Sequence, residues 1–288
     1  MSSGQPHTFT LGGFLLTGTD GDGCFWTVSD IQGWFTGSDI RTATQSKAQQ
    51  SGSWRGKTFP DGRIIVARGQ VTAPSTAVLE LAGRRLSALL RDGSFDEFMG
   101  ESEAGSFTSL VQMDSTPQFT PLSDVKATWQ VAVGSEDPLL YGPVWYSSAT
   151  LAGSIAGAGR AWPRAWTRDW GVPAGTIEGA VSVPNAGLAT YWPRFRIYGP
   201  VTNPTVGVAE TGALLTFHGT IPAGQFIDID AGARTVTYGP NADDVRYLTD
   251  VAGNWPAVIP GGVSVTYDAD TADPAAVLHV YGYEGAWH

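Results

Sequence analysis

Positions 59–71 of the chain read FPDGRIIVARGQV, a group of turn-forming residues followed by an apolar run. The turn residues are Pro60-Asp61-Gly62, and the segments Ser53–Phe59 and Arg63–Val71 lie on either side of them. Turn residues between two segments rich in apolar and aromatic side chains are typical of a β-hairpin. The sequence therefore predicts two strands here, paired with each other around the turn.

A helix is predicted after this stretch, from about Thr76 to Arg91. Apolar residues recur in it at three- and four-residue spacing, which gives a helix one apolar face. They are Val78, Leu79, Ala82, Leu86, Leu89 and Leu90. Ser75 or Thr76 can cap the start of the helix, and Asp92-Gly93 is a suitable stop signal.

Further strands are predicted on both sides of this helix. They are Thr8–Leu16, Trp129–Val133, Ala213–Gly219, Gln225–Asp230, Arg234–Tyr238, Val263–Tyr267 and Ala276–Tyr283. In the second half the closer strands follow one another every ten residues or so, a spacing of roughly 8–12 residues being typical of an antiparallel sandwich. The polar turn Gly134–Pro138 marks a domain boundary. We expect a mainly β protein, with the helix in residues 1–135 and a β-sandwich in residues 136–288.

The composition argues against several classes of function. The 288 residues include 17 basic and 27 acidic ones, a net charge of −10, whereas tight nucleic-acid binding needs cations that neutralise phosphates. A single cysteine, Cys24, excludes an intramolecular disulfide and a zinc site built from several thiolates. We also expect no secretory signal and no membrane segment, since no stretch approaches the ~20 apolar residues that cross a bilayer.

No catalytic, metal-binding or cofactor-binding motif stands out. His7, His218, His279 and His288 are far apart in sequence and lie in no known motif, so we interpret them as surface residues, although the fold could still bring some of them together. The glycine-rich segment Gly153–Gly159 leads to a Trp-Pro pair instead of the helix start that a phosphate loop needs. We expect no catalytic residues, no metal and no cofactor.

Asp228 and Asp230 are the strongest candidates for a carboxylate pair. Residues i and i+2 of a strand point to the same face, so these two could hold calcium or act in glycoside hydrolysis. The alternative is a polar strand face that leads into the turn Asp230-Ala231-Gly232. We favour this alternative, because nothing nearby supplies the further oxygen ligands of a calcium site.

The eleven tryptophans include three at even spacing, Trp162, Trp166 and Trp170. On a strand they would share one face, and exposed indole rings can stack on sugar rings. Tryptophan is also common in cores and subunit interfaces. Trp162, Trp166 and Trp170 are therefore the candidates for carbohydrate binding, with packing or interface use as the favoured alternative.

Several segments together resemble the distal tail proteins of siphophages, in the form found in phages of actinobacteria. In the first half the resemblance lies in residues 59–71 and in the helix Leu79–Leu90. In the second half it lies in Ile197–Pro204, Pro222–Asp230, Arg234–Val236, Trp255–Gly261 and Tyr281–Trp287. None of these segments is specific alone, but their order over nearly the whole chain is.

The resemblance implies a structural protein of the virion tail, assembled in the host cytoplasm, and not an enzyme. Residues 1–135 would form a belt domain that closes into a homo-hexameric ring, and residues 136–288 a galectin-like sandwich outside it. The ring would join the tail tube protein to a tip or fibre hub protein, with the tape-measure protein as a further possible neighbour. DNA would pass through its channel without specific binding.

Two other functions stay open from the sequence. The first is a carbohydrate-binding module that attaches to a host surface glycan, either as a free protein or as an added role of the tail protein. The second, which we favour less, is a glycoside hydrolase that uses Asp228, Asp230 or another carboxylate pair. A fold resemblance alone does not decide between them, because function depends on the site and not on the fold.

Overall fold

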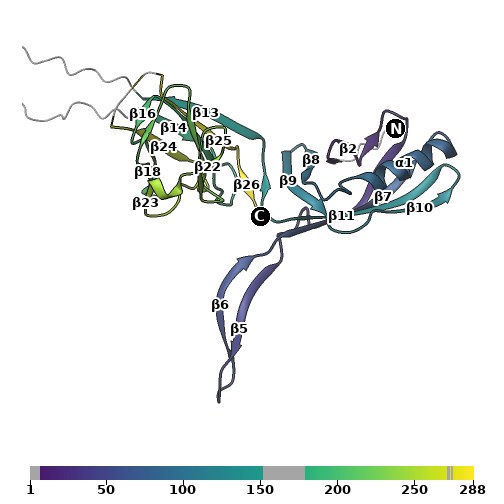
Figure 1. Ribbon diagram of the computed structural model, residues 1–288. Coiled ribbons are helices and arrows are strands. Elements are labelled where there is room, and N and C mark those ends of the chain that lie inside the picture. The colour runs from purple at the N-terminus through teal and green to yellow at the C-terminus, as the bar shows by residue number, and fades with distance from the viewer. Residues whose placement is uncertain (1–6, 152–178, 271–272, 274) are drawn as a thin grey trace, which may run out of the picture. The chain divides into compact units, whose positions relative to one another are not determined.

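The computed structural model describes residues 7–151, 179–270, 273 and 275–288. The chain divides into two compact units, one made of Met1–Pro143 with Trp287–His288 and the other of Val144–Ala286 (Figure 1). Residues 136–143, which the sequence analysis assigned to the second domain, lie in the first unit. The roles of belt and galectin-like sandwich for the two parts stay predictions.

The first unit is built on an antiparallel sheet. Its strands follow the order β2 (Phe14–Leu15), β1 (His7–Leu11), β8 (Asp96–Ser102), β9 (Gly105–Met113), β11 (Lys126–Ser135), β7 (Arg63–Thr72), β4 (Phe25–Gln32) and β3 (Gly18–Thr19). Two more strands extend it: β10 (Gln118–Ser123) pairs with β11, and β12 (Leu140–Tyr141) pairs with β9. Near the end of the chain, β26 (Ala286–Trp287) brings the ring of Trp287 to 4.9 Å from that of Phe107.

The core of the first unit follows from alternation along its strands. Every second residue of β7 is buried, from Arg63 through Ile65, Ala67 and Gly69 to Val71. A Cβ atom at Gly69 would overlap the carbonyl oxygen of Thr27 and lie 2.8 Å from the ring of Trp129. Glycine at this position therefore lets β4 and the Trp129 ring approach the backbone of β7 closely.

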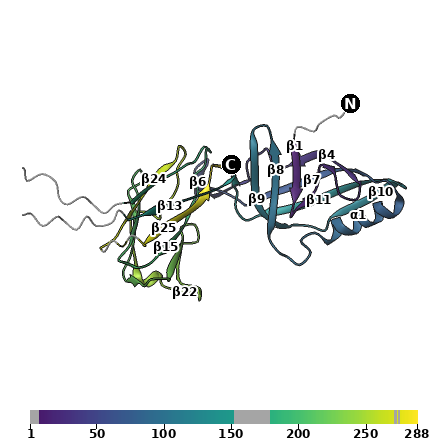
Figure 2. The same cartoon turned by 90° about the horizontal axis from the view of Figure 1, so that it is seen from above.

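Helix α1 (Thr76–Ala88) begins where the sequence predicted and ends three residues earlier than expected. The Ser75 hydroxyl caps it by accepting a hydrogen bond from the amide of Val78. Leu79, Ala82 and Leu86 form its buried face. The predicted last turn is not helical, because Leu89 is extended and Leu90 has a positive φ of 48°. Figure 2 shows α1 lying alongside β10.

The predicted hairpin around Pro60-Asp61-Gly62 is wrong in its pairing. Both strands exist, but β6 (Ser53–Pro60) pairs with β5 (Ile40–Ser46), and β7 pairs with β4 and β11. The reason is burial: β7 has an apolar face for the sheet, whereas all eight residues of β6 are exposed. The turn residues therefore form a corner where the chain leaves one sheet for another.

The predicted opening strand Thr8–Leu16 is also divided. Gly12 and Gly13, with φ of 54° and 76°, form a tight turn between β1 and β2, which pair with each other. A left-handed backbone is accessible to glycine at little cost, so this pair reverses the chain where the apolar pattern alone suggested continuity.

The second unit contains two antiparallel sheets, which Figure 2 shows from above. One has the order β13 (Val144–Thr150), β25 (Val277–Tyr283), β15 (Arg194–Tyr198), β20 (Phe226–Asp230), β21 (Thr235–Tyr238) and β22 (Asp243–Asp244). The other has the order β14 (Gly179–Val183), β24 (Val263–Asp268), β17 (Thr205–Val208), β18 (Ala213–Phe217) and β23 (Thr249–Ala252). The remaining elements are the pair β16 (Val201–Thr202) and β19 (Thr220–Ile221), and the short 3₁₀ helix η1 (Arg246–Leu248).

These strands confirm the mainly β prediction, and each strand predicted in the second half is present. Buried and partly exposed residues alternate along β15, β20, β24 and β25, which is the pattern of sheets with one face in a core. Tyr191 is buried beside this core, and its hydroxyl donates a hydrogen bond of 2.8 Å to the carbonyl of Tyr283. Burial raises the pKa of Tyr191 to about 12.

Among the helices that the structure describes, α1 and η1 included, none combines the length and the apolar character needed to cross a membrane.

Candidate interaction surfaces

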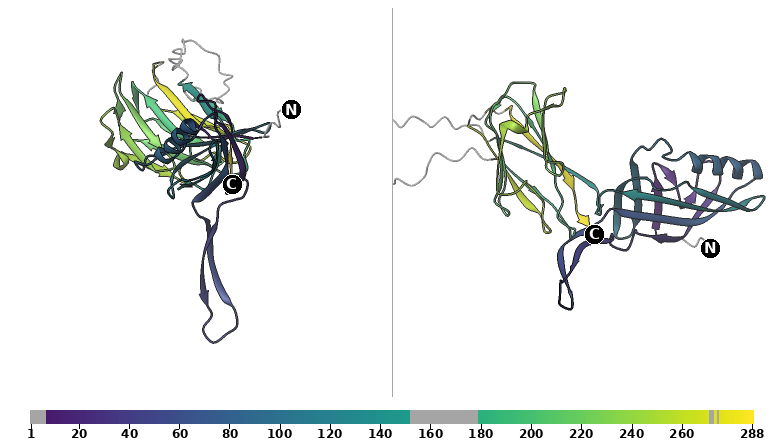
Figure 3. Two further views of the ribbon diagram at one scale, coloured as in Figure 1. Left: turned by 90° about the vertical axis from the view of Figure 1, so that its right-hand side faces the viewer. Right: turned by 60° about the horizontal axis from the view of Figure 1, so that its bottom comes forward.

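The most exposed element of the first unit is the two-stranded ribbon formed by β5 and β6, Ile40–Pro60, which we call the arm. Figure 3 shows it extending away from the sheet of its own unit in both views. All of β6 and all but one residue of β5 are exposed, including the apolar side chains Ile40 (70%), Trp54 (67%) and Phe59 (48%). A lone two-stranded ribbon is marginally stable in water. Such a ribbon with large exposed apolar side chains is a candidate contact surface.

A β-bulge gathers the two aromatic rings of the arm on one face. Arg41 lies opposite Phe59 and Gln45 lies opposite Trp54, while the register shifts between Thr42 and Thr44. Arg41 and Gln45 are four residues apart in a strand and share a face, so their partners Phe59 and Trp54 share it too. Without the bulge these rings, five residues apart, would point to opposite faces.

This face is also cationic. The ammonium groups of Lys47 and Lys57 lie over the rings of Trp54 and Phe59, at 4.8 and 5.5 Å from the ring centroids. Residues 40–60 contain four basic and no acidic side chains, a net charge of +4. The whole chain has 17 basic and 27 acidic residues, so the rest of the chain carries 13 against 27, a net charge of −14. The arm is a basic element on an acidic protein.

Arg63, which the sequence analysis did not single out, anchors the base of the arm. Its side chain is 1% exposed and donates to the carbonyl oxygens of Gly33 (2.6 Å), Thr36 (2.8 Å) and Pro138 (2.8 Å). Burial lowers the pKa of its guanidinium, and the carboxylate of Asp137 opposes that effect. Arg63 thus joins the loop that precedes β5 to the segment that follows β11. The signal in the sequence was a basic residue at an inward position of an alternating strand.

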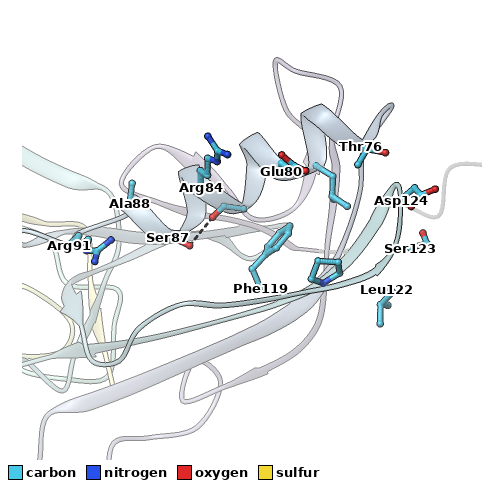
Figure 4. Close-up of a pocket in the computed structure, with 13 residues that line it drawn as sticks. Thr76, Glu80, Arg84, Ser87, Ala88, Arg91, Phe119, Leu122, Ser123 and Asp124 are labelled. Carbon is cyan, nitrogen blue, oxygen red and sulfur yellow. Dashed lines mark hydrogen bonds between the residues drawn. The ribbon is translucent and has the colours of Figure 1, made fainter.

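A groove of about 1020 Å³ lies between α1 and β10 (Figure 4). Phe119 points from β10 toward the helix, where a Cβ atom at Gly83 would come within 2.9 Å of its ring. Leu122 is exposed at the end of β10, and Glu80 and Arg84 line the helix side. Among the described strands β10 pairs only with β11, so its other edge is open. An open edge beside a groove is a second place where another chain can bind.

Asp228 and Asp230 lie on one face of β20, as the sequence predicted. Each of these carboxylates is paired with an arginine side chain of the neighbouring strand β15. Arg196 donates two hydrogen bonds, of 2.6 and 2.7 Å, to Asp228, and Arg194 lies 2.8 Å from Asp230. Asp230 also accepts a hydrogen bond from the amide of Ala233 in the following turn. These contacts are those of a polar strand face with a turn, and they oppose both the calcium and the glycosidase hypotheses.

Aromatic side chains gather on the same outer face of this sheet. The hydroxyl of Tyr146 is 3.1 Å from Nδ1 of His279, and the ring centroid of His279 is 5.0 Å from that of Tyr198. Tyr281 lies beside them, at 5.2 Å from Tyr146. We call these four residues the tyrosine–histidine face. Burial and the nearby Arg196 lower the pKa of His279, which favours its neutral form.

Of the other predicted site residues, some lie outside the described part of the chain and the rest lie apart from one another. Trp162, Trp166 and Trp170 and the glycine-rich segment lie outside the described residues. His218 lies 2.7 Å from Asp250, far in sequence from His279. Within residues 7–151 and the described part of 179–288, no group of three or more His, Cys, Asp or Glu side chains could hold a metal ion. Cys24 is buried, and burial raises the pKa of its thiol.

Comparisons with known proteins identify the class to which this fold is similar. Residues 186–283 match the family of siphovirus-type tail components, over the C-terminal domain of that family. No curated protein matches the chain by sequence.

A particular solved structure then covers almost the whole chain. The Dit protein (gp 19.1) of phage SPP1, described as a paradigm of the hub adsorption apparatus in phages that infect Gram-positive bacteria, superposes with a TM-score of 0.64. The sequences are 14% identical, and the match covers 99% of this chain and 100% of the other. The activated baseplate of phage P2 with calcium matches at a TM-score of 0.49 and 12% identity, over 98% of this chain and 100% of that chain. The resemblance to siphophage distal tail proteins is thereby confirmed.

Proposed function

We propose that this chain is a structural adaptor at the distal end of a phage tail, and that its copies close into a ring, six-membered as the resemblance implies. The ring joins the tail tube to a tip or fibre hub and leaves a channel for DNA. Its partners are the tail tube protein, the hub protein and further copies of itself. The observation that carries the proposal is the match of the complete two-unit fold to a tail hub protein, together with the family match of residues 186–283.

The surfaces of the first unit support self-assembly. A ring needs two different patches on each copy that meet in a repeating, heterologous contact. The arm and the open edge of β10 offer such patches, because both present backbone or side chains that no described residue of the unit covers.

The charge of the chain suits a conduit for DNA. Six copies at a net charge of −10 each would carry about −60 in total, and a surface of like charge repels the phosphate backbone. DNA can then slide past the protein without binding tightly. The basic arm is the exception to this charge, which argues that the arm faces protein and not the channel.

Size measurement in solution tests the proposal. Light scattering coupled to gel filtration, with negative-stain images, should give a closed ring, either for the chain alone or after the tail tube or hub protein is added. A persistent monomer under all three conditions would contradict the adaptor function.

We also propose carbohydrate binding on the tyrosine–histidine face as a second role, acting in attachment to the host surface. Three tyrosine rings, one imidazole and the Arg196–Asp228 pair lie together on this outer face, and Tyr146 is half exposed. Aromatic rings that can stack on a sugar, next to groups that can bind its hydroxyls, are the usual composition of such sites.

A glycan array with the full chain tests this second role. Tyr146→Ala with Tyr281→Ala should lower any binding at least tenfold, whereas Tyr247→Ala, at an exposed tyrosine of η1, should not change it. Loss of binding in Trp162→Ala with Trp166→Ala, but not in the tyrosine variant, would instead assign the site to the tryptophans predicted from the sequence. No binding to any glycan would exclude the role for the sugars tested.

A further inference from the structure

Hydrogen-bonding side chains form one continuous line across the outer face of the six-stranded sheet. Each lies directly opposite the next on the neighbouring strand, in the order Ser148 (β13), His279 (β25), Arg196 (β15), Asp228 (β20) and Thr237 (β21). We call these five residues the polar row. Neighbouring strands are about 4.8 Å apart, so the row crosses about 19 Å of the sheet. A ligand that follows it is therefore an extended chain, longer than a single sugar ring.

Aromatic rings border the polar row on both sides. The rings of Tyr146 and Tyr281 lie 5.2 Å apart on one side, and those of Tyr198 and Phe226 lie 5.6 Å apart on the other. Each of these residues is two positions along its strand from a member of the row, on the same face of the sheet. Aromatic rings that stack on a sugar, beside polar groups that bind its hydroxyls, suit a carbohydrate ligand.

The Arg196–Asp228 pair in the row offers donors and acceptors side by side. Arg196 donates hydrogen bonds of 2.6 and 2.7 Å to Asp228, and the central carbon of its guanidinium lies 4.3 Å from the ring centroid of Phe226. Both side chains of the pair stay about one third exposed, at 34% and 38%. The guanidinium has further N–H donors and the carboxylate further lone pairs. Because adjacent sugar hydroxyls both donate and accept, they can bind the two partners at once.

This face carries no net charge. The strands β13, β25, β15, β20 and β21 contain two arginines and two aspartates, paired with each other, and His279 with its lowered pKa adds no charge. An anionic ligand would have to draw an arginine from its partner, which leaves a partly buried carboxylate unpaired. The second unit also repels anions, since residues 144–286 have 7 basic and 12 acidic side chains, a net charge of −5. The face therefore favours an uncharged ligand.

We infer that the polar row binds a neutral oligosaccharide that runs across the strands from β13 to β21. Adjacent hydroxyls of one sugar bind Arg196 and Asp228, and the aromatic pairs on either side contact the apolar faces of the sugar rings. This inference rests on the carbohydrate role proposed above for the tyrosine–histidine face. It adds the class of the ligand, an uncharged chain of several sugar units, and the direction in which that chain lies.

Isothermal titration calorimetry with the full chain tests the class of ligand. The neutral probes are linear tetrasaccharides of glucose, galactose, mannose and arabinose, each compared with its monosaccharide. The charged probes are tetragalacturonate and a glycerol phosphate oligomer. Asp228→Asn keeps the shape of the side chain but removes its charge. Asp250→Asn is the matched control, because Asp250 is an exposed aspartate paired with His218 on the other sheet. Thermal unfolding followed by circular dichroism checks that each variant is folded.

We expect the wild type to bind at least one neutral tetrasaccharide at least tenfold more tightly than its monosaccharide and than either charged probe. Asp228→Asn should weaken this binding at least tenfold. The same variant should strengthen the binding of tetragalacturonate, because Arg196 is then no longer neutralised. Asp250→Asn should change neither affinity. Thr237→Val removes a hydroxyl from the end of the row and should weaken the binding of the tetrasaccharide about threefold.

Tighter binding of a charged probe than of every neutral one overturns the inference but leaves the carbohydrate role standing. Neutral binding that Asp228→Asn leaves unchanged does the same. If Asp228→Asn did not fold, unchanged binding in Thr237→Val would overturn the inference in its place. No binding to any probe contradicts the carbohydrate role and the inference together, while the adaptor proposal is tested separately by ring formation.

Discussion

At the scale of single residues, Arg63 shows how one buried charge organises a region. A guanidinium has five N–H donors in a planar arrangement, so it can satisfy several carbonyl groups that point to one place. Here these carbonyls belong to Gly33, Thr36 and Pro138, which come from two separate segments. Because its bonds join two separate loop segments beside the arm, we expect the position of the arm base to depend on Arg63.

Replacement of Arg63 by methionine should destabilise the first unit by about 3 kcal/mol. Methionine fills part of the space but leaves the three carbonyl groups without donors, and a buried unsatisfied polar group costs about 1–3 kcal/mol. Urea denaturation of the full chain, followed by tryptophan fluorescence, measures the change in the free energy of unfolding.

The control for this prediction is Arg68→Met in the same strand. Arg68 is exposed, and its ion pair with Asp30, at 3.5 Å, is on the surface, so its loss should cost less than about 1 kcal/mol. If the two variants were equally stable, the bonds of Arg63 would contribute no more than a surface ion pair.

At the scale of elements, the arm and β7 show that neighbouring strands in sequence can differ completely in environment. β7 is paired on both sides and buries alternate residues, whereas β6 has one partner and buries none. A strand gains stability mainly from side chains packed on its faces. The arm lacks such packing among the described residues, so we expect it to become fully ordered only when a partner binds it.

Hydrogen exchange should therefore separate the arm from the sheet. In the monomeric chain we expect amides of residues 40–60 to exchange within seconds to minutes, while those of β7 and β11 stay protected for hours. On assembly the arm amides should become protected at least tenfold. Mass spectrometry of both states measures this, and an arm that is already as protected as β7 in the monomer would contradict it.

At the scale of the whole molecule, the distribution of charge matters more than its total. The net charge of −10 alone suggests a soluble acidic protein, but it combines a basic arm with a remainder at −14. At physiological salt the Debye length is about 8 Å, so charges farther apart than that are largely screened from one another. An acidic partner that approaches the arm closely would therefore be attracted by its four basic side chains more than it is repelled by the distant acidic remainder.

Local patterns were enough to predict much of the fold. Apolar spacing predicted α1 to within three residues at its end, and alternation predicted the strands of the second half. The series of segments in order predicted a resemblance to siphophage distal tail proteins, which the family match of residues 186–283 bears out for that part of the chain. These features are local because helix spacing and strand alternation depend on residues close together in the chain.

Only the tertiary structure decided which strands pair and which polar groups meet. The sequence indicated that β6 and β7 are strands, but it did not indicate that β6 pairs with β5 in an exposed arm. The partner of a strand depends on which of its faces is buried against the rest of the fold, and a short stretch of sequence does not contain that information. The sequence also indicated that Asp228 and Asp230 share a face, but not that Arg194 and Arg196 of β15 would neutralise them. The local pattern of apolar and polar residues indicates which residues of a strand are buried. Which distant residues come into contact is decided only when the whole chain packs.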